Sequence, residues 1–196
     1  MEKYYIVKYS GIFGFIKPWT AVRDSDVFSQ QFLTPSIIEG IEKKLFPELL
    51  NREGEIIKIV GHRLRYDQIS EQQEVVQPRG WNSKRKGKQY LFTRPTSILI
   101  RGVMINPTLH LAFHSLEDAR QAATQHICLC RNEDLLFPEE LQEVSIDEFN
   151  SSRFPGFELV FEKEENSFLV GYNRYTNQPM YGWLRIVGNP VGQRTY

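Results

Sequence analysis

The apolar residues of this chain recur with two different periods, which together predict an α+β fold. Residues 4–10 and 56–66 are rich in aromatic and β-branched residues, a composition typical of strands. Between them, Thr34 is a suitable N-cap, and Pro35 suits the first helical position, where its missing N–H costs nothing. The predicted helix continues with apolar residues every four positions along one face: Ile37, Ile41 and Leu45.

The second half of the chain repeats this order of elements. Two apolar segments, 98–105 and 109–113, are separated by an Asn-Pro turn signal. Ser115 then opens a capping box in its Asp variant, and we predict a helix from there to about Arg131. Two late strands are predicted after an acidic loop, at 157–161 and 181–187.

Strand, helix, strand, followed by strand, helix, strand, is the order of the ferredoxin-like βαββαβ core that RNA-recognition modules also use. We therefore predict a single domain over residues 1–196 with this core. The stretch 67–95 interrupts the order, because it is polar, Gln-rich and then basic. We predict that it forms an inserted hairpin or loop that protrudes from the core. Many functions use this fold, so it does not by itself identify one.

Charge is separated along the chain, although the formal net charge is zero. The stretch 133–165 is strongly acidic and carries only Arg153 and Lys163 as cations. A protein with one basic excursion and one acidic surface can bind a polyanion locally while its other side repels it. The basic stretch, residues 79–94, contains no acidic residue, and its cations are Arg79, Lys84, Arg85, Lys86, Lys88 and Arg94.

The basic segment also carries aromatic residues between its charges. Lysine and arginine neutralise phosphates, and the released counterions make binding salt-dependent. Trp81, Tyr90 and Phe92 can stack on unpaired bases, for about 1–3 kcal/mol each. This combination predicts contact with single-stranded RNA. The alternative is a solvated loop that is basic for solubility.

Further candidate RNA contacts lie in the first third of the chain. Lys17, Trp19 and Arg23 follow the first strand, where the arginine can fork two N–H donors onto a phosphate. Trp19 is a candidate for stacking, or alternatively plugs the edge of the core. The helix start at Ser36 leaves free N–H groups that can hold a phosphate, as any capped helix does.

Arg63 and Arg65 share one face of a predicted strand, where RNA binding on a sheet surface would require them. Alternation on any half-exposed strand produces the same pattern, so the alternative is a purely structural role.

Metal binding and secretion are not expected. Leu109, Leu111 and Phe113 alternate as in a strand. In an extended chain, residues four apart such as His110 and His114 are roughly 13 Å from each other, too far to share one ion. The only cysteines, Cys128 and Cys130, cannot staple a secreted scaffold, and we expect buried thiols in a reducing cytoplasm. His126 lies on the apolar stripe of the second predicted helix, so we expect it to be buried. No apolar run approaches the roughly 20 residues that span a bilayer, no nucleotide-binding or hydrolase motif is present, and no cofactor is predicted.

Three neighbouring segments resemble the N-terminal signature of the fifth CRISPR-associated family, which belongs to the RAMP superfamily. They are the aromatic and glycine-marked run Gly11–Trp19, the helix start Phe32–Ser36 and the helix Ile37–Ile41. Other segments are similar to the central β-pair, the second helix and the following loop of that family: 101–105 with 109–113, 126–131 and 135–138.

The resemblance implies a RAMP-type ferredoxin-like fold with an inserted thumb hairpin. It also implies a non-catalytic, RNA-binding subunit of a type I CRISPR surveillance complex (Cascade) in a prokaryotic cytoplasm. Such a subunit grips the 5′ handle of the guide RNA (crRNA) beside the backbone subunit and the large subunit. It reaches target DNA only through the complex.

One branch of this family also cleaves the precursor RNA without metal, using a tyrosine, a lysine and a histidine. These align with Phe46, Gln125 and His126. Phenylalanine has no hydroxyl that could exchange a proton, and a glutamine amide has no charge to stabilise a phosphorane. We therefore expect no catalysis. A metal-independent endoribonuclease remains the first alternative, and a ferredoxin-like protein of another class the second.

Overall fold

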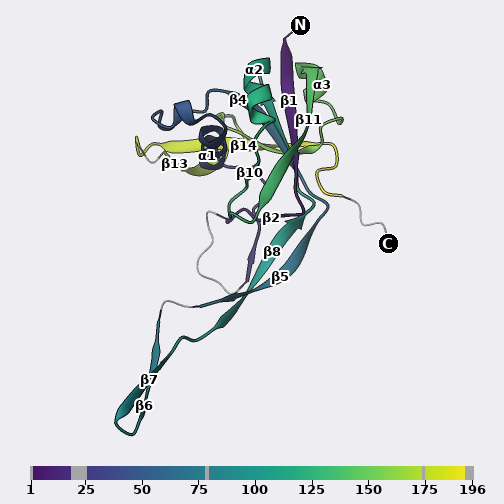
Figure 1. Ribbon diagram of the computed structural model, residues 1–196. Coiled ribbons are helices and arrows are strands. Elements are labelled where there is room, and N and C mark those ends of the chain that lie inside the picture. The colour runs from purple at the N-terminus through teal and green to yellow at the C-terminus, as the bar shows by residue number, and fades with distance from the viewer. Residues whose placement is uncertain (1, 19–25, 78–79, 174, 193–196) are drawn as a thin grey trace.

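The computed structural model describes residues 2–18, 26–77, 80–173 and 175–192, and confirms an α+β fold built mainly from antiparallel strands. A body at one end carries a long, narrow arm of paired strands (Figure 1). The body is one eight-stranded sheet, whose strands in spatial order are β10 (Ile127–Cys128), β11 (Leu135–Ser145), β1 (Lys3–Ser10), β9 (Thr108–Phe113), β4 (Ile59–Arg65), β12 (Gly156–Val160), β14 (Pro179–Val187) and β13 (Phe168–Tyr172).

The main core lies between this sheet and two helices, α1 (Pro35–Leu45) and α2 (Leu116–Ala122). The predicted α1 is confirmed, with Thr34 in extended conformation at its N-cap and Pro35 in its first turn. Its buried apolar residues belong to the same core cluster as Val7 and Tyr9 of β1. Because neighbouring residues of a strand point to opposite faces, Ile6 joins a second cluster on the other side of the sheet, with Phe149 of α3 (Ile146–Phe149).

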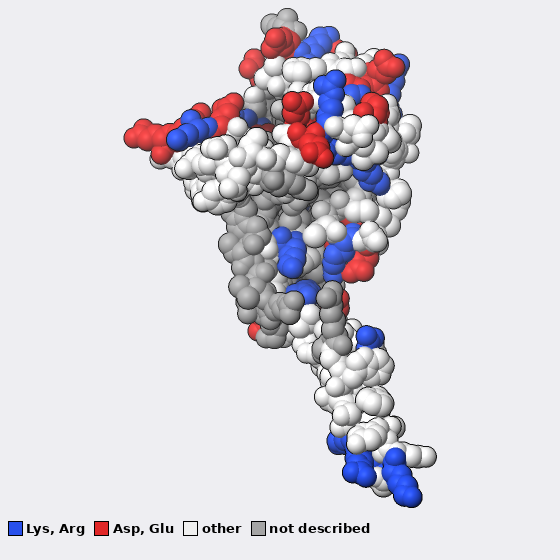
Figure 2. Space-filling view, turned by 90° about the vertical axis from the view of Figure 1, so that its left-hand side faces the viewer, with Lys and Arg blue, Asp and Glu red and all other residues white. Residues whose placement is uncertain are grey.

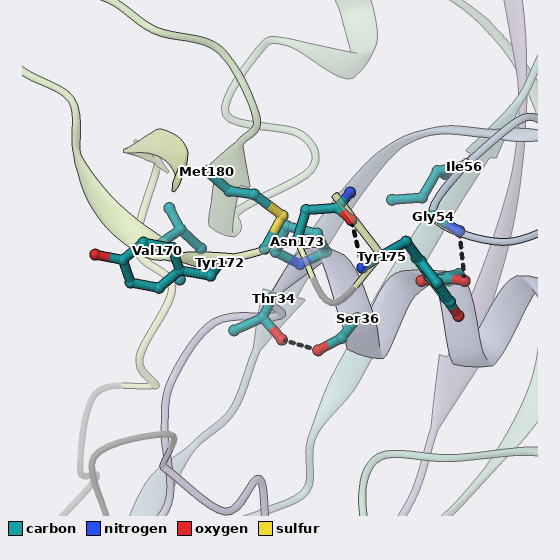
Figure 3. A pocket seen from close by; sticks show the side chains of 12 residues that line it. Thr34, Ser36, Gly54, Ile56, Val170, Tyr172, Asn173, Tyr175 and Met180 are labelled. Carbon is teal, nitrogen blue, oxygen red and sulfur yellow. Dashed lines mark hydrogen bonds between the residues drawn. The ribbon is translucent and has the colours of Figure 1, made fainter. Parts of the chain in front are cut away.

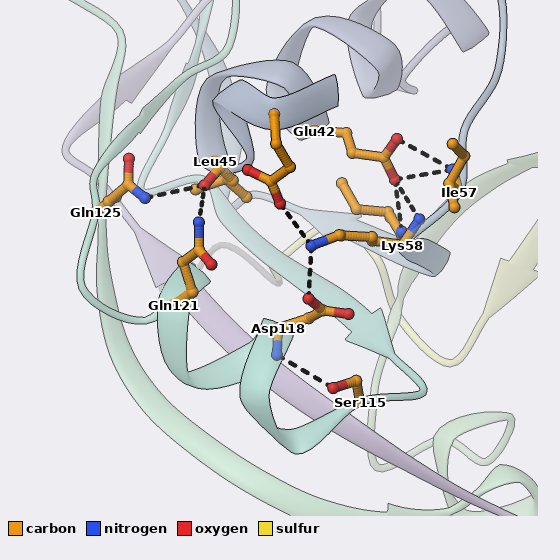
Figure 4. A network of polar contacts seen from close by, with 10 residues as sticks. Glu42, Leu45, Ile57, Lys58, Ser115, Asp118, Gln121 and Gln125 are labelled. Carbon is orange, nitrogen blue, oxygen red and sulfur yellow. Dashed lines mark hydrogen bonds and ion pairs between the residues drawn. The ribbon is translucent and has the colours of Figure 1, made fainter. Parts of the chain in front are cut away.

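A polar network ties α1 to the start of β4 (Figure 4). The buried carboxylate of Glu42 accepts hydrogen bonds from the backbone N–H groups of Ile57, Lys58 and Ile59, at 2.6–3.0 Å. Lys58 also pairs with Asp118 of α2 and with Glu48 of the short 3-10 helix η1 (Pro47–Leu49). A buried carboxylate with charge-assisted hydrogen bonds holds these elements at fixed positions.

The second predicted helix is shorter than expected. Its start at Ser115 is confirmed, since the serine hydroxyl accepts from the backbone N–H of Asp118. The helix ends at Ala122, and the chain then turns to form β10, which pairs with β11. Because this strand replaces the predicted last turns, His126 and Cys130 are exposed, and the expectation that they are buried was wrong.

The acidic loop predicted before the late strands is largely a strand. β11 pairs with β1 from Lys3↔Ser145 to Ser10↔Phe137, and its buried residues include Leu136 and Val144. Its glutamates face solvent and form ion pairs with lysines of β1, such as Lys8 with Glu139 at 2.7 Å.

The arm comprises four consecutive strands between β4 and β9, together with two short strands at its root. The lower half pairs β5 (Gln68–Val76) with β8 (Ser97–Ile105) over nine residue pairs. At the root, β8 also pairs with β2 (Phe13–Gly14) and with β3 (Asp26–Phe28). The far half is the hairpin of β6 (Asn82–Lys86) and β7 (Gln89–Thr93).

Candidate nucleic-acid interface

The end of the arm is a tight two-stranded hairpin with a two-residue loop. Lys86 pairs with Gln89, and Gly87 between them has φ +64°, a left-handed value that glycine adopts without strain. Every residue of β6 and β7 is exposed. The hairpin therefore has two solvent-facing surfaces and no core of its own.

Cations are concentrated at this end of the arm, while acidic side chains gather on the body (Figure 2). The Nε of Arg85 donates to the carbonyl of Gly87 at 3.0 Å. In the part of the chain that the structure describes, none of the four end cations forms an ion pair with a carboxylate: Lys84, Arg85, Lys86 and Lys88. Their charge is therefore available to an external anion.

The register divides the hairpin into two chemically different faces, because directly paired residues share a face. Lys84 pairs with Leu91, and Lys86 pairs with Gln89, so one face is lysine-rich. Arg85 pairs with Tyr90 on the other face, and Ser83 pairs with Phe92. The second face thus offers an arginine and two aromatic rings, the groups that bind phosphates and stack on bases.

Large apolar side chains on this hairpin are unusually open to solvent. Tyr90 is 62% exposed, Phe92 61% and Trp81 60%. With more than half of each ring in contact with solvent, these side chains do not form a local core. An exposed apolar cluster of this kind marks an interaction surface.

Trp81 and Arg94 mark the junction between the two halves of the arm. The Arg94 guanidinium lies 5.0 Å from the centre of the Trp81 ring, and its Nη1 donates to Gln77 at 3.3 Å. The predicted contacts Trp81, Lys84, Arg85, Lys86, Lys88 and Arg94 therefore lie along one structural element. The remaining predicted residue of this segment, Arg79, lies outside the described residues.

The other predicted contacts are not brought to the end of the arm. Lys17 is exposed in the connection between β2 and β3, near the root of the arm. Trp19 and Arg23 lie outside the described residues. Ser36 lies at the rim of a separate pocket of about 260 Å³ beside the start of α1, where its hydroxyl is 3.1 Å from that of Thr34 (Figure 3).

Arg63 does not suit the RNA contact expected of it, because its side chain is completely buried. Its guanidinium donates to the carboxylate of Glu158 on β12 and, at 3.0 Å, to Asn150. Arg185 of β14 donates to the same carboxylate at 3.0 Å. This charge network holds adjacent strands together, and removing one partner would leave a buried charge uncompensated.

Arg65 is half-buried on the same face of β4. Its Nε is enclosed and has no hydrogen-bond partner among the described residues, and the same is true of Nδ1 of the neighbouring His110. Burial and the positive charges of Lys8, Arg63 and Arg65 lower the pKa of His110 to about 4. The imidazole is therefore neutral near pH 7 and contributes no charge of its own.

The positions that align with catalytic residues of the precursor-cleaving branch lie close together. Phe46 is completely buried, and the Gln125 amide donates to the carbonyl of Leu45 at 3.0 Å. His126 is exposed, and its backbone carbonyl accepts a hydrogen bond from the Nζ of Lys44. Lys44 belongs to α1, two residues before Phe46, and is not one of the three aligned positions.

The described residues offer neither a metal site nor a membrane-spanning helix. No group of three or more histidine, cysteine or acidic side chains is placed to hold a metal ion. None of the described helices has the length and apolar character needed to cross a membrane. In comparisons with known proteins, no family model and no curated sequence matches this chain.

Proposed function

We propose that the arm binds single-stranded RNA and that this chain is a non-catalytic RNA-binding subunit. The observation that carries the proposal is the hairpin of β6 and β7, which exposes four unpaired cations and three aromatic rings at the end of a projecting arm. Phosphates would contact the lysines and Arg85, while bases stack on Tyr90, Phe92 and Trp81. The acidic body would repel the rest of a polyanion.

We further propose that the body contains a ferredoxin-like βαββαβ core of the RAMP type. Its strands would be β1, β4, β9 and β11, with α1 after the first and α2 after the third. Their spatial order β11-β1-β9-β4, with every neighbouring pair antiparallel, supports this assignment. The arm would then be an insertion between the second and third core strands.

With this core, the N-terminal resemblance to the fifth CRISPR-associated family suggests the biological setting. The chain would cap the 5′ handle of the guide RNA in a type I surveillance complex, beside a backbone subunit and a large subunit. A splayed handle would be held by the arm through its sugar-phosphate chain and its stacked bases. The complex, and not this subunit alone, would recognise target DNA.

A first experiment separates binding from cleavage. The purified chain is incubated in EDTA with labelled repeat RNA from the CRISPR array of the source genome, and bound and cleaved RNA are measured on separate gels. We expect binding without cleavage. Neutralising Lys84, Arg85, Lys86 and Lys88 to Gln should weaken binding and reduce the salt-dependence slope by about 0.7 for each cation that contacts a phosphate.

A matched control neutralises four exposed cations of the body, Lys3, Arg52, Arg120 and Lys163. This control changes the net charge by the same amount but leaves the arm unaltered. It should therefore leave most of the affinity and the salt-dependence slope intact. Equal losses in both variants would contradict a specific role of the arm and leave only non-specific attraction.

The second candidate function is a metal-independent endoribonuclease. The observation that favours it is the exposed His126 with Lys44 beside it, because a lysine there would supply the charge that Gln125 lacks. A discrete RNA product in EDTA that disappears in both His126→Ala and Lys44→Ala would replace the non-catalytic proposal.

A further inference from the structure

The far end of the sheet, opposite β10, is an open strand edge. β13 hydrogen-bonds to β14 only, among the strands that the structure describes. It exposes Phe168, Leu169 and Tyr172, at 38%, 42% and 61%. The strand contains no charged residue or proline, the usual protections of such an edge, although its register shifts at Val170, between Leu169 and Gly171. An exposed apolar edge pairs readily with another extended chain.

A pocket opens directly beside this edge, between β13 and the start of α1 (Figure 3). Val170 and Tyr172 of β13 itself, with Met180 of β14, line one side of the pocket, and Ile56 lies on the opposite side. Alternate side chains of an added strand point to the same face of a sheet. A strand paired with β13 would therefore direct every second side chain towards this pocket.

The charges around the edge are acidic. The loop that enters β13 carries Glu162, Glu164 and Glu165, all exposed and without an ion pair to any described residue. Lys163 in the same loop lies 4.7 Å from the centre of the Tyr181 ring. Glu39 is the one charged residue among the described residues that line the pocket. Its carboxylate pairs with Lys43 at 2.7 Å. No lysine or arginine is among the described residues that line the pocket, so the pocket offers no cation to a phosphate of RNA.

We propose that β13 and its neighbouring pocket form a docking site for an extended segment of a partner protein. The segment pairs with the free edge of β13, places an apolar side chain in the pocket, and carries lysine or arginine opposite the acidic loop. This site lies on the body, is chemically opposite to the basic arm, and does not depend on RNA binding by the arm.

The test uses the full chain and a fluorescein-labelled peptide of about seven residues that alternates lysine and valine. Two control peptides alternate glutamate with valine or carry N-methyl groups that prevent strand pairing. Fluorescence anisotropy should show binding of the lysine peptide only. Neutralising Glu162, Glu164 and Glu165 to Gln should weaken the affinity for the lysine peptide roughly tenfold, because each exposed ion pair contributes a small factor and three are lost together.

Two substitutions examine the edge and the pocket separately. Leu169→Lys places a charge on the edge, and Ser36→Trp fills the pocket, so each should abolish most of the binding. Leu91→Lys makes the same chemical change on an exposed strand of the arm and should leave peptide binding unchanged.

Hydrogen–deuterium exchange distinguishes strand pairing from simple charge attraction. On binding, the amides of Phe168–Tyr172 should exchange more slowly, because edge N–H groups gain partners. Equal binding of the N-methylated peptide, or unchanged exchange in β13, would overturn the proposal. Loss of RNA affinity in Ser36→Trp, without any peptide binding by the parent chain, would instead assign the pocket to RNA.

Discussion

Neighbouring residues of β7 differ in the face of the hairpin that they occupy. Tyr90 and Phe92 lie on the face with Arg85, whereas Leu91 lies between them on the face with Lys84. All three side chains are more than half exposed, so their contribution to folding is small. Differences in RNA affinity among substitutions here therefore report directly on which face contacts the bases.

We predict that Tyr90→Ala and Phe92→Ala each weaken binding of single-stranded RNA by about 1–3 kcal/mol, the usual value of a base–aromatic stack. Leu91→Ala serves as the matched control and should change affinity much less, because leucine has no π-face. Titration of a labelled RNA at fixed salt gives all three values. A larger loss for Leu91→Ala than for either aromatic substitution would assign the contact to the lysine face.

Two buried histidines should make the stability of the body depend on pH. Burial lowers the pKa of His62 to about 3 and that of His110 to about 4. In the unfolded chain both titrate near 6.5, so the unfolded state binds more protons in the window between these values. The free energy of unfolding should therefore fall as the pH decreases from about 6.5 to about 4.

Urea unfolding followed by circular dichroism at several pH values within this window measures the effect. Each histidine contributes a slope of at most about 1.4 kcal/mol per pH unit. A double variant, His62→Gln with His110→Gln, lacks both titrating imidazoles, so its slope should be shallower. An unchanged slope would show that other groups cause the acid sensitivity.

Alternation along β4 correctly predicted the shared face of Arg63 and Arg65, but not their different burial. The partners of Arg63 are Glu158 and Asn150, which are 95 and 87 positions away in the sequence. A local pattern contains no information about such distant partners. The exposure of the four end cations was easier to predict, because the polar and basic composition of one short segment was enough to indicate a protruding element.

At the scale of elements, α1 is held in place by Glu42 more than by its own caps. Its N-cap residue Thr34 makes no side-chain capping hydrogen bond, whereas Glu42 reaches three backbone N–H groups before and within β4. This carboxylate satisfies donors that would otherwise be buried without a partner.

We expect Glu42→Ala to reduce the free energy of unfolding by about 1–3 kcal/mol, since it leaves these N–H groups unsatisfied. Glu48→Ala is the matched control, because Glu48 is half-exposed and only pairs with Lys58 at the surface. That control should change stability by less than about 1 kcal/mol. Urea unfolding measures both, and similar losses would contradict the central role of Glu42.

The elements that sequence patterns predicted best were those with strong local signals. The Thr-Pro start and four-residue apolar spacing identified α1, and β-branched runs identified β1, β8 and β9. The last turns predicted for α2 fail because β11 offers Ile127 and Cys128 a strand partner. β11 itself was missed, because its glutamates are uncommon in strands and only pairing with the lysines of β1 accommodates them.

At the scale of the whole molecule, the arm separates the basic hairpin from the acidic body (Figure 2). The arm is fixed at its root, where β8 pairs with β2, β3 and β5, and both of its ends enter the central sheet through β4 and β9. An anion held at the far end is thus kept away from the carboxylates of the body. This separation would let a chain with no net charge offer a positive surface to a polyanion such as the RNA proposed here.

We propose above all that the hairpin of β6 and β7 is the part of this chain that contacts RNA. The most direct measurement is ultraviolet crosslinking of the purified chain to repeat RNA that carries 4-thiouridine, followed by mass spectrometry of the crosslinked peptides. We predict crosslinks at Trp81, Tyr90 or Phe92, and their loss when the four end cations are neutralised. Crosslinks confined to the body, unchanged in that variant, would contradict the account.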